Sequence, residues 1–201
     1  GLTAGKVYKV TAWVRARLSN NQTAPVTGIT MDAGGSSVAI TGTLVGSSQL
    51  YLDNYTVYGT ADSEGTLTVN FKVACTNASW LSFQNLKYEE ATVTALDESA
   101  SNTISEASDA YVTLKRSFVN GYYNTLVLPF DLTADQVKAA FGSDAKVYSF
   151  ANTEGDQVNF TEATTISANV PVLITTDKTA TEFTFTNVDV KRATPTATGT
   201  N

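Results

Sequence analysis

The first 90 residues consist of short runs in which hydrophobic and polar positions alternate. Residues 6–16, KVYKVTAWVRA, alternate throughout, which is the period of a strand with one buried face. The small and apolar set is Tyr8, Val10, Ala12, Val14 and Ala16. The opposite set is Lys9, Thr11, Trp13 and Arg15. Turn-forming Gly, Ser and Asn clusters separate the further predicted strands, which lie at residues 26–32, 36–45, 49–59 and 65–75.

The last two runs of this half carry more detail. In residues 65–75 the predicted inward row is Leu67, Val69, Phe71, Val73 and Cys75. Residues 80–88, WLSFQNLKY, alternate at Leu81 and Phe83, and the alternation resumes at Leu86 and Tyr88 one step out of phase. One extra residue in a strand is the pattern of a β-bulge, so we predict a bulge where the alternation breaks, at Gln84-Asn85.

The second half, residues 110–192, is again of β type apart from one helical segment. Strands are predicted at residues 111–118, 122–132, 145–150, 156–161, 169–176 and 181–190. The first two of these strands are joined by Val119-Asn120-Gly121, and Asn-Gly is a strong hairpin signal, so they are predicted to pair.

Residues 124–142, NTLVLPFDLTADQVKAAFG, run from a strand almost directly into a helix. Leu126, Leu128, Phe130 and Leu132 form one apolar row, which places Pro129 on the opposite face at an edge. Thr133 and Gln136 have the spacing of a capping box, and Gly142 is a helix stop. No nucleophile stands at this join, so we interpret it as a corner of the scaffold and not as an active-site elbow.

These patterns predict an all-β protein with two β-sandwich (jelly-roll-like) domains, the second containing one short α-helix. The predicted domains are residues 1–90 and 110–192. Residues 91–109 are acidic, rich in Ser and Ala and poor in large hydrophobic side chains, so they are predicted to be a linker with a short edge strand at most. Residues 193–201 have no hydrophobic pattern and are predicted to form a flexible tail.

Composition narrows the possible functions. The formal charge is −6 and the 13 Lys and Arg residues are scattered, which argues against a nucleic-acid partner. No apolar run approaches the roughly 20 residues of a membrane span. The chain has no His and one Cys, Cys75, so Ser-His-Asp and Cys-His nucleophile activation and His-ligated metal sites are excluded. No phosphate loop or dinucleotide fingerprint occurs, and we predict a non-enzyme without cofactor or metal.

The first half resembles the jelly-roll carbohydrate-binding modules of the galactose-binding-like fold, particularly those attached to polysaccharide hydrolases. The matching segments are G-L-x-A-G-K-x-Y-K-V-T-A-W-V-R-A at the start, the strand Tyr55-Thr56-Val57, the strand G-T-L-T-V, and Phe83-Gln84-Asn85-Leu86. The resemblance covers residues 1 to about 90 and implies a carbohydrate-binding ancestry. Such modules usually have strands before the first of these segments, so the resemblance also implies a truncated domain. Their last strand often has Asp where this chain has Gln84, which bears against their structural calcium site.

The second half resembles a recurrent β module of large extracellular proteins of gut-dwelling Gram-negative anaerobes. The match rests on N-T-L-V-L-P-F-D-L-T, the short Q-V helix after it and the later V-P-V-L-I strand, and it covers residues 110 to about 192. In those proteins several more strands usually follow, so we expect an internal fragment. The resemblance implies a secreted or cell-surface protein of bacterial origin.

Four side chains are the candidates for ligand binding. Trp13 lies on the polar face of its strand between Lys9 and Arg15, and Trp80 begins a strand that neighbours it in the resembling fold. Exposed indoles beside cations suit sugars, because the ring stacks on C–H faces and polar groups bind hydroxyls. Two interpretations of Trp13 remain open, since it would equally pack under a loop or between modules. Tyr51 is the fourth candidate, after Trp13, Arg15 and Trp80.

The sequence therefore predicts a non-catalytic extracellular module pair that binds glycans or serves in adhesion. The competing prediction is a structural spacer or stalk that binds no small molecule. Sandwiches that lack strands have unpaired edges, which predicts homodimers or other edge-to-edge association.

Overall fold

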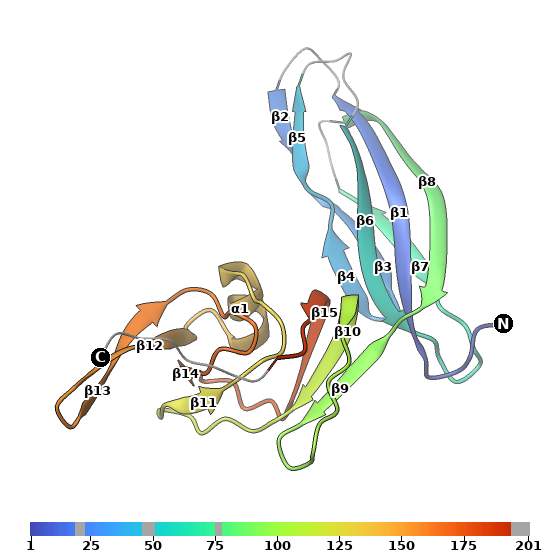
Figure 1. Cartoon of the computed structure of the whole chain (residues 1–201). Coiled ribbons are helices and arrows are strands. Elements are labelled where there is room, and N and C mark those ends of the chain that lie inside the picture. Colours follow the sequence, from blue (N-terminus) through green and yellow to red (C-terminus); the bar gives the residue numbers. More distant parts are fainter. Residues whose placement is uncertain (19–22, 46–50, 75–77, 194–201) are drawn as a thin grey trace. The chain divides into compact units, whose positions relative to one another are not determined.

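The computed structural model describes residues 1–18, 23–45, 51–74 and 78–193. The protein is all-β, and α1 is the one helix in these described ranges (Figure 1), as the sequence predicted. Contacts divide the chain into unit 1, Gly1–Ala91, and unit 2, Thr92–Asn201. Of the predicted tail, residues 194–201 lie outside the described residues.

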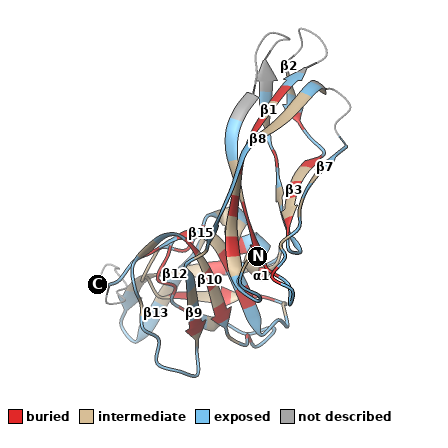
Figure 2. Cartoon of the chain, turned by 90° about the vertical axis from the view of Figure 1, so that its right-hand side faces the viewer, coloured by how far each residue is buried: buried red, intermediate tan, exposed pale blue. Residues whose placement is uncertain are grey.

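Unit 1 is built around β1 (Val7–Leu18), which pairs antiparallel with β6 (Tyr51–Thr60) and with β8 (Ala78–Glu90). The alternation predicted for this strand is confirmed: its inward side chains are buried, and Trp13 on the other face is exposed (Figure 2). The inward row is Tyr8, Val10, Ala12, Val14 and Ala16. A central strand with two neighbours satisfies the backbone hydrogen bonds on both of its edges.

A second sheet covers the inward row of β1. Its strand order is β4 (Ser36–Ala39), β3 (Ile29–Ala33) and β7 (Val69–Val73). Ile29, Met31 and Ala33 of β3 belong to the same buried cluster as Val10 and Val14, so this unit is a β-sandwich. A two-stranded sheet of β2 (Thr23–Val26) and β5 (Gly42–Val45) completes it, and the single strand predicted at 36–45 is therefore two strands in different sheets.

The predicted bulge in β8 is confirmed. Trp13 pairs with Gln84 and Thr11 pairs with Lys87, so that two residues of β8, Asn85 and Leu86, oppose the single residue between them on β1. Asn85 has φ 51°, in the left-handed region that Asn tolerates better than most side chains.

The strand predicted at residues 65–75 is shorter than expected. Only Val69–Val73 forms β7, and Val73, predicted to point inward, is 52% exposed. Val73 pairs with Ile29 at the end of the ladder, at the rim of the sheet, where one more step of alternation does not reach the core. Cys75 lies outside the described residues.

The two sheets of unit 1 approach each other closely at a pair of glycines. A Cβ on Gly59 of β6 would lie 2.7 Å from the backbone carbon of Ala33, and one on Gly34 would lie 2.7 Å from the backbone nitrogen of Thr60. Gly34 also has φ +51°. Each position therefore excludes a side chain for steric reasons, because backbone atoms cannot move aside as a flexible side chain can.

Unit 2 contains a sheet in which β10 (Ala107–Lys115) lies between β15 (Glu182–Val190) and β9 (Val93–Asp97). β9 runs parallel to β10 at the edge of the sheet. It lies within the segment 91–109, which was predicted to be a linker with a short edge strand at most. Leu96 is buried in the core of unit 2 and Ile104 packs against that core. The segment is therefore part of unit 2, because its few apolar side chains pack into the core of that unit. The composition of the segment alone does not show this.

The other sheet of unit 2 has the order β11 (Asn124–Leu126), β14 (Val172–Thr175), β12 (Lys146–Glu154) and β13 (Gln157–Ala163). The predicted hairpin at Asn120-Gly121 is wrong, because β10 and β11 are in different sheets. The Asn124 side chain accepts a hydrogen bond from Val119 N and donates to the carbonyls of Val119 and Tyr122. This turn passes the chain from one sheet to the other.

The corner at residues 124–142 carries much of the core of unit 2. The predicted row Leu126, Leu128, Phe130 and Leu132 is buried. Pro129, predicted to lie at an edge on the face opposite this row, is buried as well, since its carbonyl accepts a hydrogen bond from Lys191 N and brings that segment over it.

The helix α1 (Ala134–Phe141) has the predicted boundaries. Thr133 and Gln136 form the capping box and Gly142 ends the helix. Phe141 packs against the rings of Phe183 and Phe185 of β15, with ring centroids 5.3 and 5.8 Å away.

The glycine contact in unit 1 yields a stability prediction. Replacing Gly59 by Ala places a methyl group against the backbone of Ala33, so the free energy of unfolding of unit 1 should fall by about 1–3 kcal/mol. Urea denaturation followed by tryptophan fluorescence measures this, because Trp13 and Trp80, the two tryptophans of the chain, both lie in unit 1. The control Thr60→Ala, which truncates an exposed neighbour, should change stability by less than about 0.5 kcal/mol. Equal stability of the two variants would contradict the close approach.

Candidate functional site

The outward face of the sheet β6-β1-β8 brings together three of the four predicted site residues. Trp13 and Arg15 are neighbours on this face of β1, and Trp80 is on β8 in the row of Arg17. The indoles of Trp13 and Trp80 are 38% and 43% exposed. These side chains are held on extended, hydrogen-bonded strands, so their positions are fixed by backbone pairing.

Arg15 lies on β1 between the row of Trp13 and the row of Trp80. It pairs with Ser82 across β8, one diagonal step from Trp80, and its guanidinium carbon lies 5.8 Å from the centroid of the Trp80 ring. This distance is within the range of a cation–π contact. Arg15 Nε is shielded from solvent and has no hydrogen-bond partner among the described residues. The guanidinium is therefore held against the indole and not tied to a carboxylate.

Polar side chains that the sequence reasoning missed flank Trp13. The register places Asn54 of β6 on one side of Trp13 and Gln84 of β8 on the other. The periodicity of β1 and β8 was predicted, but the pairing register that aligns these residues was not. We call the set Trp13, Arg15, Asn54, Trp80, Ser82 and Gln84 the indole–arginine face.

Tyr51 does not join this set by register. Its backbone pairs with Ala16, which belongs to the inward row of β1 and is out of step with Trp13 and Arg15. The side chain of Tyr51 lies outside the described residues.

The outward face of the other sheet of unit 1 differs in chemistry. Asp32 of β3 accepts hydrogen bonds from Ser37 and Thr30 and forms an ion pair with Lys72 at 2.6 Å. The hydrogen bond from Lys72 and then the one from Ser37 lower the pKa of Asp32 from 3.8 to about 2. A carboxylate stabilised in this way stays ionised and is unsuited to act as a general acid or base near neutral pH.

The carboxylates of unit 2 serve as structural ties. Asp97 accepts hydrogen bonds from the Ser99 hydroxyl and backbone, which with the pairing to Lys115 lower its pKa. Glu98 accepts from Ser117 N and pairs with Arg116 at 3.5 Å. These residues of the predicted linker therefore hold a loop to β10. They line a cavity of about 310 Å³, but both carboxylates are engaged there in hydrogen bonds and ion pairs.

A further ionic tie closes the corner that follows β11. Asp131 accepts a hydrogen bond from Ala168 N and pairs with Lys191, and the pairing with Lys191 is the main cause of its lowered pKa. The same pairing raises the pKa of Lys191.

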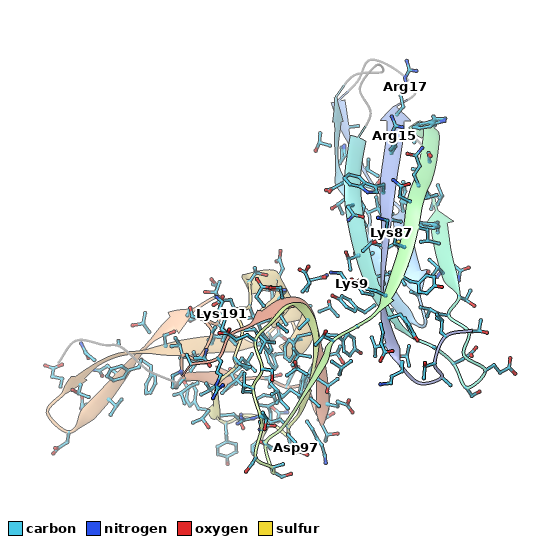
Figure 3. All side chains as sticks on the ribbon, turned by 45° about the vertical axis from the view of Figure 1, so that its right-hand side comes forward. Lys9, Arg15, Arg17, Lys87, Asp97 and Lys191 are labelled. Carbon is cyan, nitrogen blue, oxygen red and sulfur yellow. The ribbon has the colours of Figure 1, made fainter. Side chains whose placement is uncertain are left out.

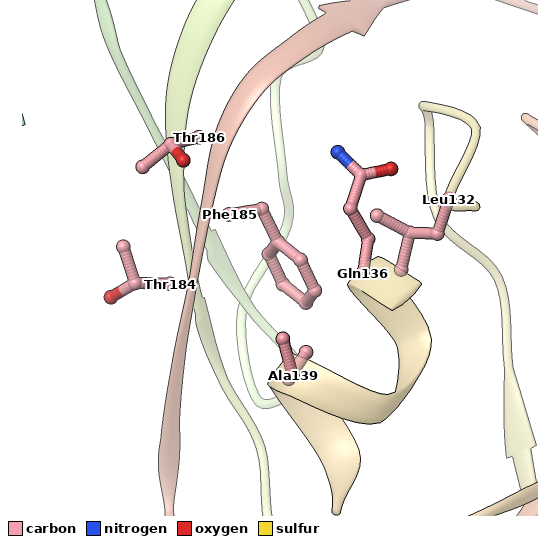
Figure 4. Close-up of a pocket in the computed structure, with 7 residues that line it drawn as sticks. Leu132, Gln136, Ala139, Thr184, Phe185 and Thr186 are labelled. Atoms are coloured by element: carbon pink, nitrogen blue, oxygen red, sulfur yellow. The ribbon is translucent and has the colours of Figure 1, made fainter. Parts of the chain in front are cut away.

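Two cavities, one in each unit, have mainly apolar walls. A cavity of about 560 Å³ in unit 1 has mostly apolar walls that include Val10, Leu67, Val69, Leu86 and Tyr88. One of about 170 Å³ lies between α1 and β15, where Gln136 projects beside Leu132 and Phe185 (Figure 4). The Gln136 side chain is already used there, since its Oε1 accepts a hydrogen bond from Thr133 N.

The described residues contain no group of three or more Cys, Asp or Glu side chains placed to hold a metal ion. Within the same residues, no helix combines the length and the hydropathy needed to span a bilayer.

Neither the scan against protein-family models nor the search of curated proteins gave a match to this chain.

The Asp32–Lys72 pair predicts a pH dependence of the stability of unit 1. Because the folded-state pKa of Asp32 is below its unfolded value of 3.8, its stabilising effect is fully present above about pH 4 and is lost as the pH falls towards 2. We expect Asp32→Asn to be less stable than the parent protein at pH 5 and the difference to shrink steadily down to pH 2. Urea midpoints measured by tryptophan fluorescence give this difference, and the control Glu64→Gln should follow the parent at every pH. A difference that is constant from pH 5 to 2 would show that the ion pair is not its cause.

Proposed function

We propose that this chain is a non-catalytic, extracellular module pair whose unit 1 binds glycans. The observation that supports the proposal is the pair of exposed indoles, Trp13 and Trp80, on one face of one sheet with Arg15 between them. Scattered single hydrophobic side chains are normal on a protein surface, whereas aligned indoles flanked by polar groups are typical of a binding face.

The chemistry of the face suits a carbohydrate. An indole ring packs against the C–H face of a pyranose, and the amides of Asn54 and Gln84 with the hydroxyl of Ser82 supply donors and acceptors for sugar hydroxyls. The side chains stand on a paired sheet, so little conformational entropy would be lost on binding. The face is shallow, and we infer that it binds weakly and without covalent chemistry.

The location outside the cell is part of the same proposal. It rests on the resemblance of both halves to modules of exported proteins, through the segments quoted above. The absence of a reaction is likewise proposed, and it is supported by the engagement of Asp32, Asp97 and Asp131 in hydrogen bonds and ion pairs.

Single tryptophan substitutions test the glycan proposal. Trp13→Ala and Trp80→Ala should each weaken binding on a glycan array by about tenfold or more, because each removes a stacking surface. The control Tyr122→Ala removes a 68% exposed aromatic from unit 2 and should leave the array signals unchanged. Silence of the parent protein across the array would support the alternative, a structural spacer or stalk that binds no small ligand.

We also infer that the chain associates through β13. This strand is at the edge of its sheet, has β12 as its one partner among the described strands, and has Val158 and Phe160 exposed on one face. An edge with unpaired backbone groups and apolar side chains favours pairing with the same strand of a second copy.

Light scattering at increasing protein concentration tests this association. The parent protein should shift from monomer to dimer, and Val158→Glu should remain monomeric because it places a charge beside the pairing edge. The matched control Val119→Glu changes an equally exposed valine in a loop and should dimerise like the parent. A parent protein that stays monomeric at all concentrations would refute the inference.

A further inference from the structure

Aromatic rings and cations alternate along the indole–arginine face and its two neighbouring rows, where a row is a set of residues paired across β1 and β8. From the C-terminal end of β1, the first row contains Arg17 and Trp80 and the second contains Arg15. The third contains Trp13, and the fourth contains Thr11 and Lys87. Each step is two residues along a strand, or about 7 Å, so the two tryptophan rows are about 14 Å apart. The spacing is too long for one sugar ring to contact both indoles, and it favours an extended ligand that lies along the strands.

The charges in these rows have one sign. None of the four rows contains a carboxylate in register, and neither Arg15 nor Lys87 forms an ion pair with a described residue. Figure 3 shows Arg17, Arg15 and Lys87 in succession along β1 and β8, and the strip ends at the next row, where Lys9 pairs with Glu89 of β8. Residues 1–31 contain four Lys and Arg residues and no Asp or Glu.

The positive rows stand out against the rest of the chain. Unit 1 contains six Lys and Arg and six Asp and Glu, so the formal charge of −6 resides in unit 2. A positive strip on a unit without net charge creates a local potential that attracts an anion.

Arg15 is arranged to bind an oxyanion. Its contact with the Trp80 ring holds the guanidinium in place, and within the described part of the chain no carboxylate forms an ion pair with it. A planar guanidinium donates paired hydrogen bonds to carboxylate or sulfate oxygens, and the prior ordering by the indole lowers the entropy lost on binding.

We propose that the ligand of the indole–arginine face is an acidic polysaccharide, a chain whose sugar rings carry carboxylate or sulfate groups. The rings stack on Trp80 and Trp13, and the acid groups pair with Arg15 and Lys87 in the alternate rows. This inference rests on the proposed glycan-binding function and narrows its substrate class.

A single-stranded nucleic acid would also combine rings with negative charges. The polysaccharide is favoured because Asn54 and Gln84 flank Trp13 with amides that suit the hydroxyl groups of a sugar ring.

The experiment compares matched acidic and neutral polymers by isothermal titration calorimetry with the intact chain. The first pair is polygalacturonate and its fully methyl-esterified form, and the second is dextran sulfate and dextran. An oligothymidylate is the nucleic-acid probe. We expect the acidic member of at least one pair to bind about tenfold more tightly than its neutral partner, with affinity that falls as salt rises from 0.05 to 0.5 M.

Two variants test whether the preference for acidic polymers comes from the indole–arginine face. Arg15→Gln should remove most of the preference for the acidic polymer while binding of the neutral polymer changes less than about twofold. The control Lys6→Gln also removes one positive charge from unit 1, at an exposed ion pair with Glu90. This variant should keep the preference for the acidic polymer. Thermal melting confirms that each variant is folded.

The outcomes separate the two proposals. Equal binding of acidic and neutral partners would overturn the acidic-ligand inference and leave glycan binding standing. Binding of none of the four polysaccharides would overturn the acidic-ligand inference, and silence of the parent protein on the glycan array would overturn the glycan proposal as well. Oligothymidylate binding as tight as that of the best polysaccharide would also overturn the inference.

Discussion

The pairing register of β1 is the constraint on which the rest of unit 1 depends. In a strand the side chains alternate between faces, so the pairing that buries Val10, Ala12 and Val14 necessarily exposes Trp13 and Arg15. A shift of one residue would place the cations in the core and the valines in water. The hydrophobic effect therefore fixes the candidate site indirectly, since the core sets the register and the register sets the outward rows.

Because of the bulge in β8, Trp80 at one end of the strand and Lys87 at the other both point to the outward face of the sheet. Before the bulge Leu81 and Phe83 oppose the inward row of β1, and after it Tyr88 does, although these positions differ in parity. With regular pairing through Asn85, one end of β8 would have its faces exchanged, and either Trp80 would point inward or Lys87 would. Binding chemistry on β8 thus depends on a single extra residue whose backbone adopts φ 51°.

Much of the fold could be predicted from local periodicity, and the failures share one physical cause. The strand faces of β1, the bulge at Asn85 and the capping box at Thr133 depend on residues close in sequence, and each is confirmed. The hairpin at Asn120-Gly121 is wrong because the partner of β11 is the distant strand β14, and the linker at 91–109 is wrong because Leu96 and Ile104 join a core built from later segments of unit 2. The reciprocal contacts of Gly34 and Gly59 also join distant segments, and no local pattern distinguishes them from turn glycines.

The residues of the candidate site also fall into those that local sequence predicts and those that strand pairing adds. Trp13, Arg15 and Trp80 could be chosen from residue type and strand parity, whereas Asn54 and Gln84 enter only through pairing. Lys87 joins the same series of rows because the bulge returns it to the outward face. A backbone ladder holds these rows about 7 Å apart and cannot adjust to a ligand as a loop can. Selectivity on such a surface therefore comes from how well the repeat of rings and charges along the ligand matches a fixed repeat on the strands, and not from enclosure.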